Sequence, residues 1–541
     1  MKRLRWLRTL CAGAVALACF LHFAGVSAAQ AAEPPTPPPP QPAPAPTAAP
    51  PGSAPASPTP QEAVPSTALP PSPPLGQPLP PPPPAAPAAA PAEEKAAEPF
   101  AFGDFTWLNG SNRQHKALLD SPIFTGSLAI DFNYTASFNN PIDNTATGST
   151  GVSRNNEFTL AAAHFGGDFH YEHARARLFM QYGMRSTVVP RNDFSSFHGQ
   201  LDLQTALRYI SEAYGGYHWD VLNGINLDAG IFMSYVGLFS YLDFENWIYI
   251  PSYTSDNTPW FFNGLRMQIF TSDKLKIEPW LINGWQTYGR FNEMPGVGFQ
   301  ILWRPTEWFS VLANGYGGWD AQDNPGRFRF HSDNSAEVKY FDDPKAGFFD
   351  KAAFSITGDI GGEQGDGVTP FGGSHNEGHC TPDKVAGDPL SGPCQQQFLS
   401  AMAYNRFWFF HDIAALTLGG GFLHNPGRYL SLLPTGVASA IPAPLSIQGI
   451  QYTPLSHNAY DTALGTTFDA WDFSAGIQYM PVEQVTYGLE YNHRKTSVPY
   501  FNGHGGVTSP DGYITTPIPP GWRPDLVDHD DRIVFSALIR F

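Results

Sequence analysis

Charged side chains spaced two or four residues apart are the groups in this chain best suited to act on other molecules. Five polar pairs have this spacing: Arg175 with Arg177, Arg208 with Glu212, Arg266 with Gln268, Lys276 with Glu278, and Glu490 with Arg494. On an extended strand, residues at this spacing point to the same face. A face that carries both cations and carboxylates would attract and orient ions or polar solutes by electrostatics.

Groupings suited to catalysis are much weaker in this sequence. A hydrolase needs a nucleophile held by an oriented base, yet His424, His493 and His504 accompany no G-x-S-x-G elbow and no Ser/His/Asp grouping. The stretch 361–367 places carboxylates between glycines, but it lacks the spaced Asp/Asn series and closing Glu of a calcium loop. We therefore expect no catalytic residue, no metal and no cofactor, with an outer-membrane enzyme as the least favoured alternative.

The elements that would position the charged residues are β-strands, because apolar and polar residues alternate with period two. Between Ser127 and Phe138 the even positions are mainly apolar and the odd positions mainly polar, and 225–233, 471–479 and 485–492 alternate in the same way. Extending the phase adds four carboxylates to the polar face: Asp131, Asp228, Asp359 and Asp472. The neighbours of Arg175 and Arg177 in the alternate positions, Ala174, Ala176, Leu178 and Met180, would then face lipid, since an arginine near the bilayer midplane costs about 2–4 kcal/mol.

Sixteen such strands can be traced, which predicts an all-β fold: a transmembrane antiparallel β-barrel. Tight links such as 166–168, 271–273 and 480–482 alternate with long loops rich in Gly, Asn and Pro. Transmembrane barrels show this alternation of short periplasmic turns and long outer loops. An even number of strands puts both chain ends in the periplasm, and fourteen or eighteen strands remain alternatives. The predicted strands are 124–139, 157–165, 169–184, 201–217, 221–236, 258–271, 274–287, 296–304, 307–320, 327–341, 351–361, 398–410, 414–424, 466–480, 483–497 and 530–541.

The two ends of the chain carry export signals. A positively charged start, an apolar stretch from Leu10 and the sequence Ala29-Gln-Ala31 predict a signal peptide over residues 1–31. The last strand alternates and ends on Phe541, which resembles the C-terminal signal read by the outer-membrane barrel assembly machinery. We expect this machinery and outer-membrane lipid to be partners, with residues 99–123 as a periplasmic lead-in to a barrel over 124–541.

Residues 32–98 form a proline-rich segment in which the stretch 34–98 holds 27 of the 54 prolines. Such a composition cannot bury a core and favours extended polyproline II geometry. We expect a disordered linker in the periplasm. It would serve either as a spacer or as a tether to peptidoglycan or a periplasmic partner.

Composition and cysteine content limit the remaining possibilities. Aromatic residues make up 14% of the chain and charged residues only 15%, which suits strands with one face in lipid. The formal net charge of −17 argues against nucleic-acid binding, which needs clustered cations. Beyond the signal peptide only Cys380 and Cys394 remain, and a cysteine pair in an exported chain predicts a disulfide, here in a surface loop.

Several stretches across the predicted barrel resemble the β-barrel porin-2 (OmpL-like) family. This resemblance implies a barrel porin, but it names no substrate and does not extend to the proline-rich segment. The stretches are 223–235, 254–266, 274–280, 329–335, 425–428, 490–494 and 498–501.

The expected function is passive diffusion of small hydrophilic solutes or ions, because sixteen strands leave an aqueous channel. The charged residues would line the pore, with cations and carboxylates on facing walls creating a transverse field. Loop 362–397 or loop 237–257 would fold into the channel and narrow it. The alternative is a structural barrel tethered to the cell wall; the solute and the oligomeric state stay open.

Overall fold

The computed structural model describes most of the chain from residue 98 onward. The predicted signal peptide and nearly all of the proline-rich segment lie outside the described residues. These are 98–541 without 194, 196–197, 322–323, 369–378, 389–390, 428, 431–444, 448–449, 453–466, 514 and 520–521.

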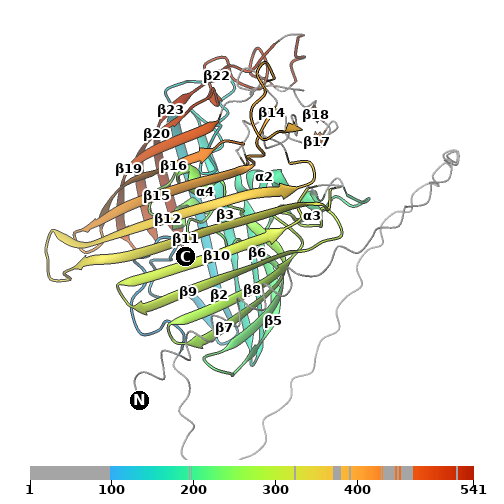
Figure 1. Cartoon of the computed structure of the whole chain (residues 1–541). Helices are drawn as coiled ribbons and strands as arrows, with labels where there is room; N and C mark the ends of the chain where they lie inside the picture. The colour runs from blue at the N-terminus through green and yellow to red at the C-terminus, as the bar shows by residue number, and fades with distance from the viewer. Residues whose placement is uncertain are drawn as a thin grey trace, which may run out of the picture. The chain divides into compact units, whose positions relative to one another are not determined.

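Sixteen antiparallel strands close into a barrel (Figure 1), as the alternation predicts. The seam pairs the first barrel strand with the last one, from Ala129 opposite Arg540 to Ser137 opposite Arg532. The barrel strands are β2 (Phe124–Ser137), β3 (Phe158–Tyr171), β4 (Ala174–Tyr182), β5 (Ile210–Trp219), β6 (Ile225–Met233), β7 (Phe261–Ser272), β8 (Leu275–Ile282), β9 (Gly296–Thr306), β10 (Phe309–Gly318), β11 (Arg327–Asp342), β12 (Phe349–Gly365), β15 (Gln397–Phe409), β16 (Ala414–Asn425), β19 (Phe468–Val482), β20 (Val485–Thr496) and β23 (His529–Arg540).

Short elements decorate the barrel. The strand β1 forms a hairpin with the start of β2, and the other short strands pair in twos within the loops. None of the helices in the described part is long and apolar enough to cross a bilayer. The short strands are β1 (Leu119–Ser121), β13 (His379–Cys380), β14 (Ser391–Gly392), β17 (Leu445–Ile447), β18 (Ile450–Tyr452), β21 (Phe501–Asn502) and β22 (Leu526–Val527); the helices are α2 (Arg185–Val188), η1 (Val189–Asn192), α3 (Leu203–Leu207), η3 (Asp243–Glu245) and α4 (Tyr253–Asp256).

The barrel has an apolar outside and a polar inside, the reverse of a water-soluble barrel. On β19 and β20, Ile477 and Leu489 are 57% and 54% exposed, whereas Ser474 and Asn492 on the opposite face are fully buried. A lipid-facing exterior and a polar interior are the arrangement of outer-membrane barrels. The exposed apolar side chains are therefore the surface that meets the membrane.

Two predicted strand boundaries are wrong. The residues 166–168 were expected to form a tight link, but β3 continues through them and the turn follows at Glu172, where φ is 53°. Gly166 lies within this strand, and a side chain there would collide with the backbone of Leu178 on β4, so the close approach of the two strands requires a glycine. The strand expected over 201–217 starts only at Ile210, since α3 occupies the preceding residues.

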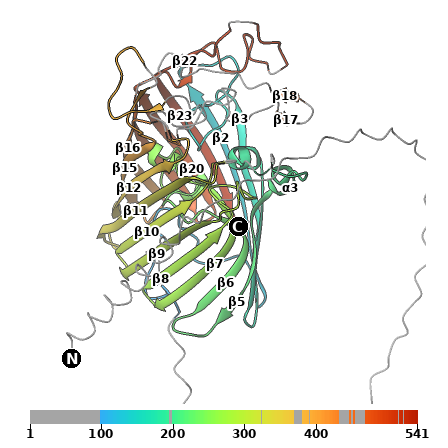
Figure 2. The ribbon, with the colours of Figure 1, turned by 45° about the vertical axis from the view of Figure 1, so that its right-hand side comes forward.

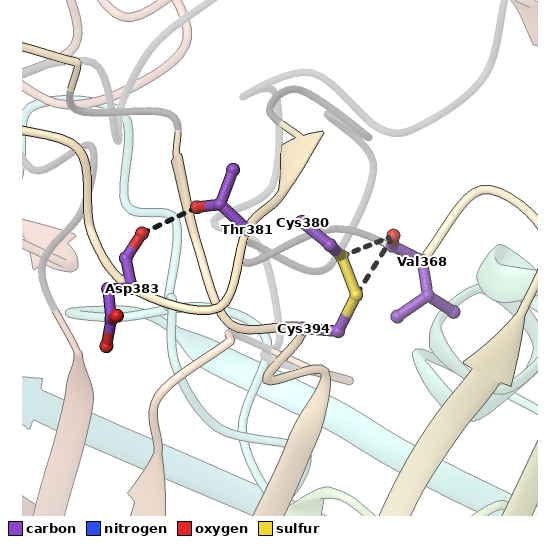
Figure 3. Close-up of a disulfide and its surroundings, with 5 residues drawn as sticks. All are labelled: Val368, Cys380, Thr381, Asp383 and Cys394. Atoms are coloured by element: carbon purple, nitrogen blue, oxygen red, sulfur yellow. Dashed lines mark hydrogen bonds between the residues drawn. A yellow bond between two sulfur atoms is a disulfide. The ribbon is translucent and has the colours of Figure 1, made fainter.

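Short turns gather at one end of the barrel and long loops at the other, where α2, α3 and the short loop strands lie (Figures 1 and 2). One of the loops at this end contains the disulfide Cys380–Cys394. Both sulfurs lie near the carbonyl oxygen of Val368, at 3.2 and 3.6 Å (Figure 3). The disulfide therefore ties together the described parts of this one loop.

The loop between β6 and β7, residues 234–260, returns into the barrel, and we call it the inserted loop. Trp247 and Ile248 pack with inward side chains of β12, β15, β16 and β19, including Tyr404 and Met480, in one buried cluster. Of the two loops expected to enter the channel, the region 237–257 therefore lies inside the barrel.

Candidate functional site

The inserted loop is fixed to one side of the barrel interior by carboxylates that the strand phase had placed there. Glu490 on β20 accepts hydrogen bonds from the backbone N–H groups of Tyr249 (2.6 Å) and Ile250 (3.1 Å). Asp472 on β19 accepts from the hydroxyl of Ser252 (2.7 Å) and the N–H of Tyr253 (3.0 Å). Each carboxyl accepts two hydrogen bonds from the loop, so these contacts hold the loop in place.

Two further predicted residues contribute to this attachment. Arg494 on β20 forms an ion pair with Asp256 of the loop at 2.5 Å, and its guanidinium lies over the ring of Tyr253. Asp131 on β2 accepts from the hydroxyl of Tyr249 at 3.1 Å. The loop is thereby attached from β19 across the seam to β2.

These residues face the interior but do not reach open water. Asp131, Asp472, Glu490 and Arg494 are between 0 and 5% exposed, because the inserted loop covers them. Asp359 on β12 is also fully buried, with His331 Nε2 at 2.9 Å from its carboxylate. The strand phase predicts that all five point inward and line the channel; in the structure all five are buried in the barrel interior.

Two inward-facing glycines make room for the loop, and sequence reasoning missed them. A side chain at Gly421 on β16 would collide with the hydroxyl of Ser252, and one at Gly476 on β19 with the side chain of Ile248. The sequence could have indicated them, because each glycine occupies a position where the alternation predicts an inward-facing polar side chain.

The wall formed by β4 to β8 carries the other predicted charges, and several remain in contact with water. Arg177 donates to Glu212 on β5 and to Asp168 on β3, both at 2.6 Å. Arg175 lies 3.3 Å from Asp228 on β6. The two arginine side chains are 28% and 27% exposed, so their charges still act on the lumen.

Farther along this wall, Arg266 on β7 donates to the same Asp228 at 2.8 Å. On β8, Lys276 lies 2.5 Å from Glu278, which also accepts from Gln268 at 3.0 Å. Each cation thus has a carboxylate on its own strand or no more than two strands away. The opposite charges of these groups alternate along one wall, whereas the sequence predicts cations and carboxylates on facing walls.

Aromatic rings that the sequence did not single out surround Arg266. Its guanidinium lies 4.6 Å from the ring centres of Tyr214 and Phe232 and 5.6 Å from that of Trp280. Contacts of this kind stabilise a cation and fix its plane. The sequence places aromatic residues at inward-facing positions of β5, β6 and β8, which could have indicated these contacts. The same pattern is equally compatible with aromatic rings that only fill the lumen.

The inserted loop brings its own carboxylate toward the seam. Glu245 lies 3.5 Å from Arg540 on β23, and both side chains are under 20% exposed. Burial raises the pKa of Glu245, while Arg540 opposes that shift. This pair, with Arg177 and Glu212 within electrostatic range, places mixed charge where the loop approaches the wall.

Two predicted residues lie elsewhere. The sequence predicts Arg208 on a barrel strand, but in the structure it follows α3 and donates to the carbonyl of Ser186 at 2.9 Å. Phe541 exchanges two backbone hydrogen bonds of 2.7 Å with Leu128 at the seam, and its ring is 43% exposed.

The chain resembles known proteins over nearly the whole barrel. Among solved structures it is similar to an anion-selective porin from Comamonas acidovorans, at 8% identity and a TM-score of 0.41, over 77% of this chain and 99% of that one. Similarity to OmpF of Salmonella typhi in complex with daunomycin is 12% identity and a TM-score of 0.39, over 77% and 97% of the chains. No curated protein matches the sequence. The family described as "Putative beta-barrel porin-2, OmpL-like" matches residues 124–516, from the start of β2 into the loop before β23.

Proposed function

Because the chain belongs to the family Putative beta-barrel porin-2, OmpL-like, whose members are outer-membrane barrels, we propose that it lets small hydrophilic solutes or ions diffuse passively across the outer membrane. The single observation that carries this proposal is the partly exposed charged wall of β4 to β8 inside a closed barrel. A sealed, purely structural barrel would have no reason to keep arginines in contact with lumen water.

The proposed pore lining is narrower than the set of polar inward residues. It consists of the charged wall together with Glu245 of the inserted loop and Arg540. The wall residues with part of the side chain exposed are Arg175, Arg177, Arg266, Gln268 and Lys276, and the buried carboxyls Glu212, Asp228 and Glu278 pair with them. Such a lining favours hydrophilic over apolar solutes, because alternating charges keep the passage hydrated.

The proposal includes an orientation. Short turns face the periplasm in outer-membrane barrels, so we assign the lead-in and the proline-rich residues 34–98 to the periplasm. The signal peptide over 1–31 would be removed on export. Phe541 would be read by the barrel assembly machinery, and residues 34–98 would act as a spacer or reach peptidoglycan.

Planar bilayer recordings test the pore. We expect the purified barrel to give stable conductance steps, and vesicles that contain it to swell in solutions of small uncharged solutes. A heat-denatured sample of the same preparation is the control. A folded barrel that gives neither conductance nor swelling would contradict the pore and favour the alternative, a structural barrel tethered through its proline-rich segment.

A further inference from the structure

The lead-in crosses the interior at the short-turn end of the barrel. On one side, the N–H of Phe100 donates to the carbonyl of Asp273 in the turn between β7 and β8, at 2.8 Å. On the other side, Arg113 donates to the carbonyl of Val485 at 2.8 Å, and His115 lies 2.8 Å from Glu483 in the turn between β19 and β20. Around the ring of sixteen strands, β8 and β20 are eight apart, so these attachments lie on opposite sides of the mouth.

Midway across, the lead-in touches both the barrel wall and the inserted loop. The N–H of Asn109 donates to Glu337 on β11 at 2.9 Å, and its side-chain oxygen accepts from the N–H of Trp247 at 2.8 Å. The indole N–H of Trp247 donates to the carbonyl of Trp107 at 3.1 Å. Trp107 and Asn109 are only 1% and 4% exposed, so this junction is part of the interior and not a surface contact.

The lead-in also contacts Glu245 of the inserted loop directly. The N–H of Gly110 donates to the carbonyl of Glu245 at 3.1 Å. Gly110, Leu238, Glu245 and Trp260 also line one cavity between the lead-in and the loop. A shift of the lead-in at this point would therefore move Glu245 relative to Arg540.

We propose that the lead-in is part of the constriction of the pore, and that Asn109 is a positioning residue that sets where the inserted loop and Glu245 stand in the lumen. This proposal rests on the proposed pore. The barrel strands alone then do not define the passage. The narrowest part of the passage is built jointly by the inserted loop and by the lead-in, which precedes the first barrel strand.

The first test compares Asn109→Ala with Asn112→Ala in the full mature chain. Asn112 is exposed and its side chain contacts only Gln114 among the described residues, so it is a matched control on the same segment. We expect N109A to raise single-channel conductance and open-channel noise and to shift ion selectivity, while N112A behaves as wild type. Heat-modifiable migration on gels would show that both variants still form the barrel.

A second test does not depend on the stability of N109A. The two cysteines of the barrel form a disulfide, so a new cysteine can be labelled alone. We expect an anionic thiol reagent to reduce the current through Ser111→Cys, and to leave Lys116→Cys, which is exposed at the mouth, nearly unaffected.

The two proposals fail differently. Unchanged conductance and selectivity in folded N109A, together with no effect of labelling at S111C, would overturn the role of the lead-in while leaving the pore intact. Absence of conductance in wild type as well as in the variants would overturn the pore itself.

Discussion

At the scale of single residues, the interior combines fixed charges with close partners. Arg175 and Arg266 share Asp228, and Arg177 bridges Asp168 and Glu212. The planar guanidinium suits such pairing because its donors match carboxylate geometry. The positive and negative charges of the wall therefore nearly cancel. Removal of the arginines should leave a net negative charge, and removal of the carboxylates a net positive one.

The double variant Arg175→Ala/Arg177→Ala tests this balance. It leaves Asp168, Glu212 and Asp228 without these arginines, so we expect the pore to favour cations more strongly than wild type. The reversal potential under a salt gradient measures the change. Arg208→Ala, which removes an arginine outside the barrel strands, is the control, and an equal shift in both variants would contradict the lumen position.

Acid should loosen the lead-in at Glu483. The hydrogen bond from His115 lowers the pKa of this carboxyl below its ordinary value of 4.5. Because the pKa is depressed in the folded state, the contact contributes fully above pH 4.5 and is lost as the pH falls through the folded value. We expect the hydrogen-exchange protection factors over residues 111–118, which correct for the intrinsic effect of pH on the rate, to fall on acidification.

The variant Glu483→Gln removes the titrating group and keeps one acceptor. We expect its hydrogen exchange over the same residues to depend less on pH than in wild type. The same acid response in both proteins would show that other carboxyls control the lead-in.

The sequence predicts which face of its strand a side chain occupies, but it does not predict what surrounds that side chain in the folded barrel. Strand phase gives the inward face of Arg175 and of Glu490 equally well, because it reports only which side of a strand a side chain occupies. It cannot tell that Glu490 is covered by a loop from a distant part of the chain. Asp168 was missed as a partner because its glycine neighbours resemble a turn.

At the scale of elements, the inserted loop depends on a few buried acceptors. Glu490→Ala would leave the N–H groups of Tyr249 and Ile250 without their acceptor, at a cost of about 1–3 kcal/mol for each buried donor left unsatisfied. We expect lost exchange protection at both amides and a wider, noisier channel. Glu490→Gln should be intermediate; a rigid loop in E490A would show that Asp472 and Arg494 suffice.

The disulfide should matter to its loop and not to the barrel. Cys380 and Cys394 enclose a short loop, so their link contributes about 3 kcal/mol at most, and locally. We expect reduction to speed proteolysis between residues 381 and 393 while heat-modifiable migration stays unchanged. Barrel unfolding on reduction would contradict this separation.

At the scale of the whole molecule, alternation was enough to predict a sixteen-stranded barrel because lipid and lumen select opposite residue types at every second position. Strand ends were harder to predict. The segment 201–209 alternates acceptably yet forms α3, whose first turn is capped by Asp202 accepting from the N–H of Thr205. Local capping there outweighs a periodicity that no neighbouring strand supports.

Closure of the barrel at the seam includes the last residue, Phe541. Deleting Phe541 removes two backbone hydrogen bonds with Leu128, each worth about 1 kcal/mol, and an exposed ring that we propose the assembly machinery reads. We expect less folded barrel in the outer membrane but near-normal refolding in detergent. Phe541→Trp should restore assembly, and equal membrane levels after deletion would rule out a role in targeting.

The path of the lead-in also determines how this protein would bear a mechanical load. A pull on Glu98 would meet the hydrogen bond between Phe100 and Asp273 first, and the buried junction at Asn109 only afterwards. Contacts loaded one after another open at lower force than contacts loaded together. Tension applied through the segment that precedes Glu98 would therefore peel the lead-in from the mouth stepwise, while the closed ring of strands stays intact.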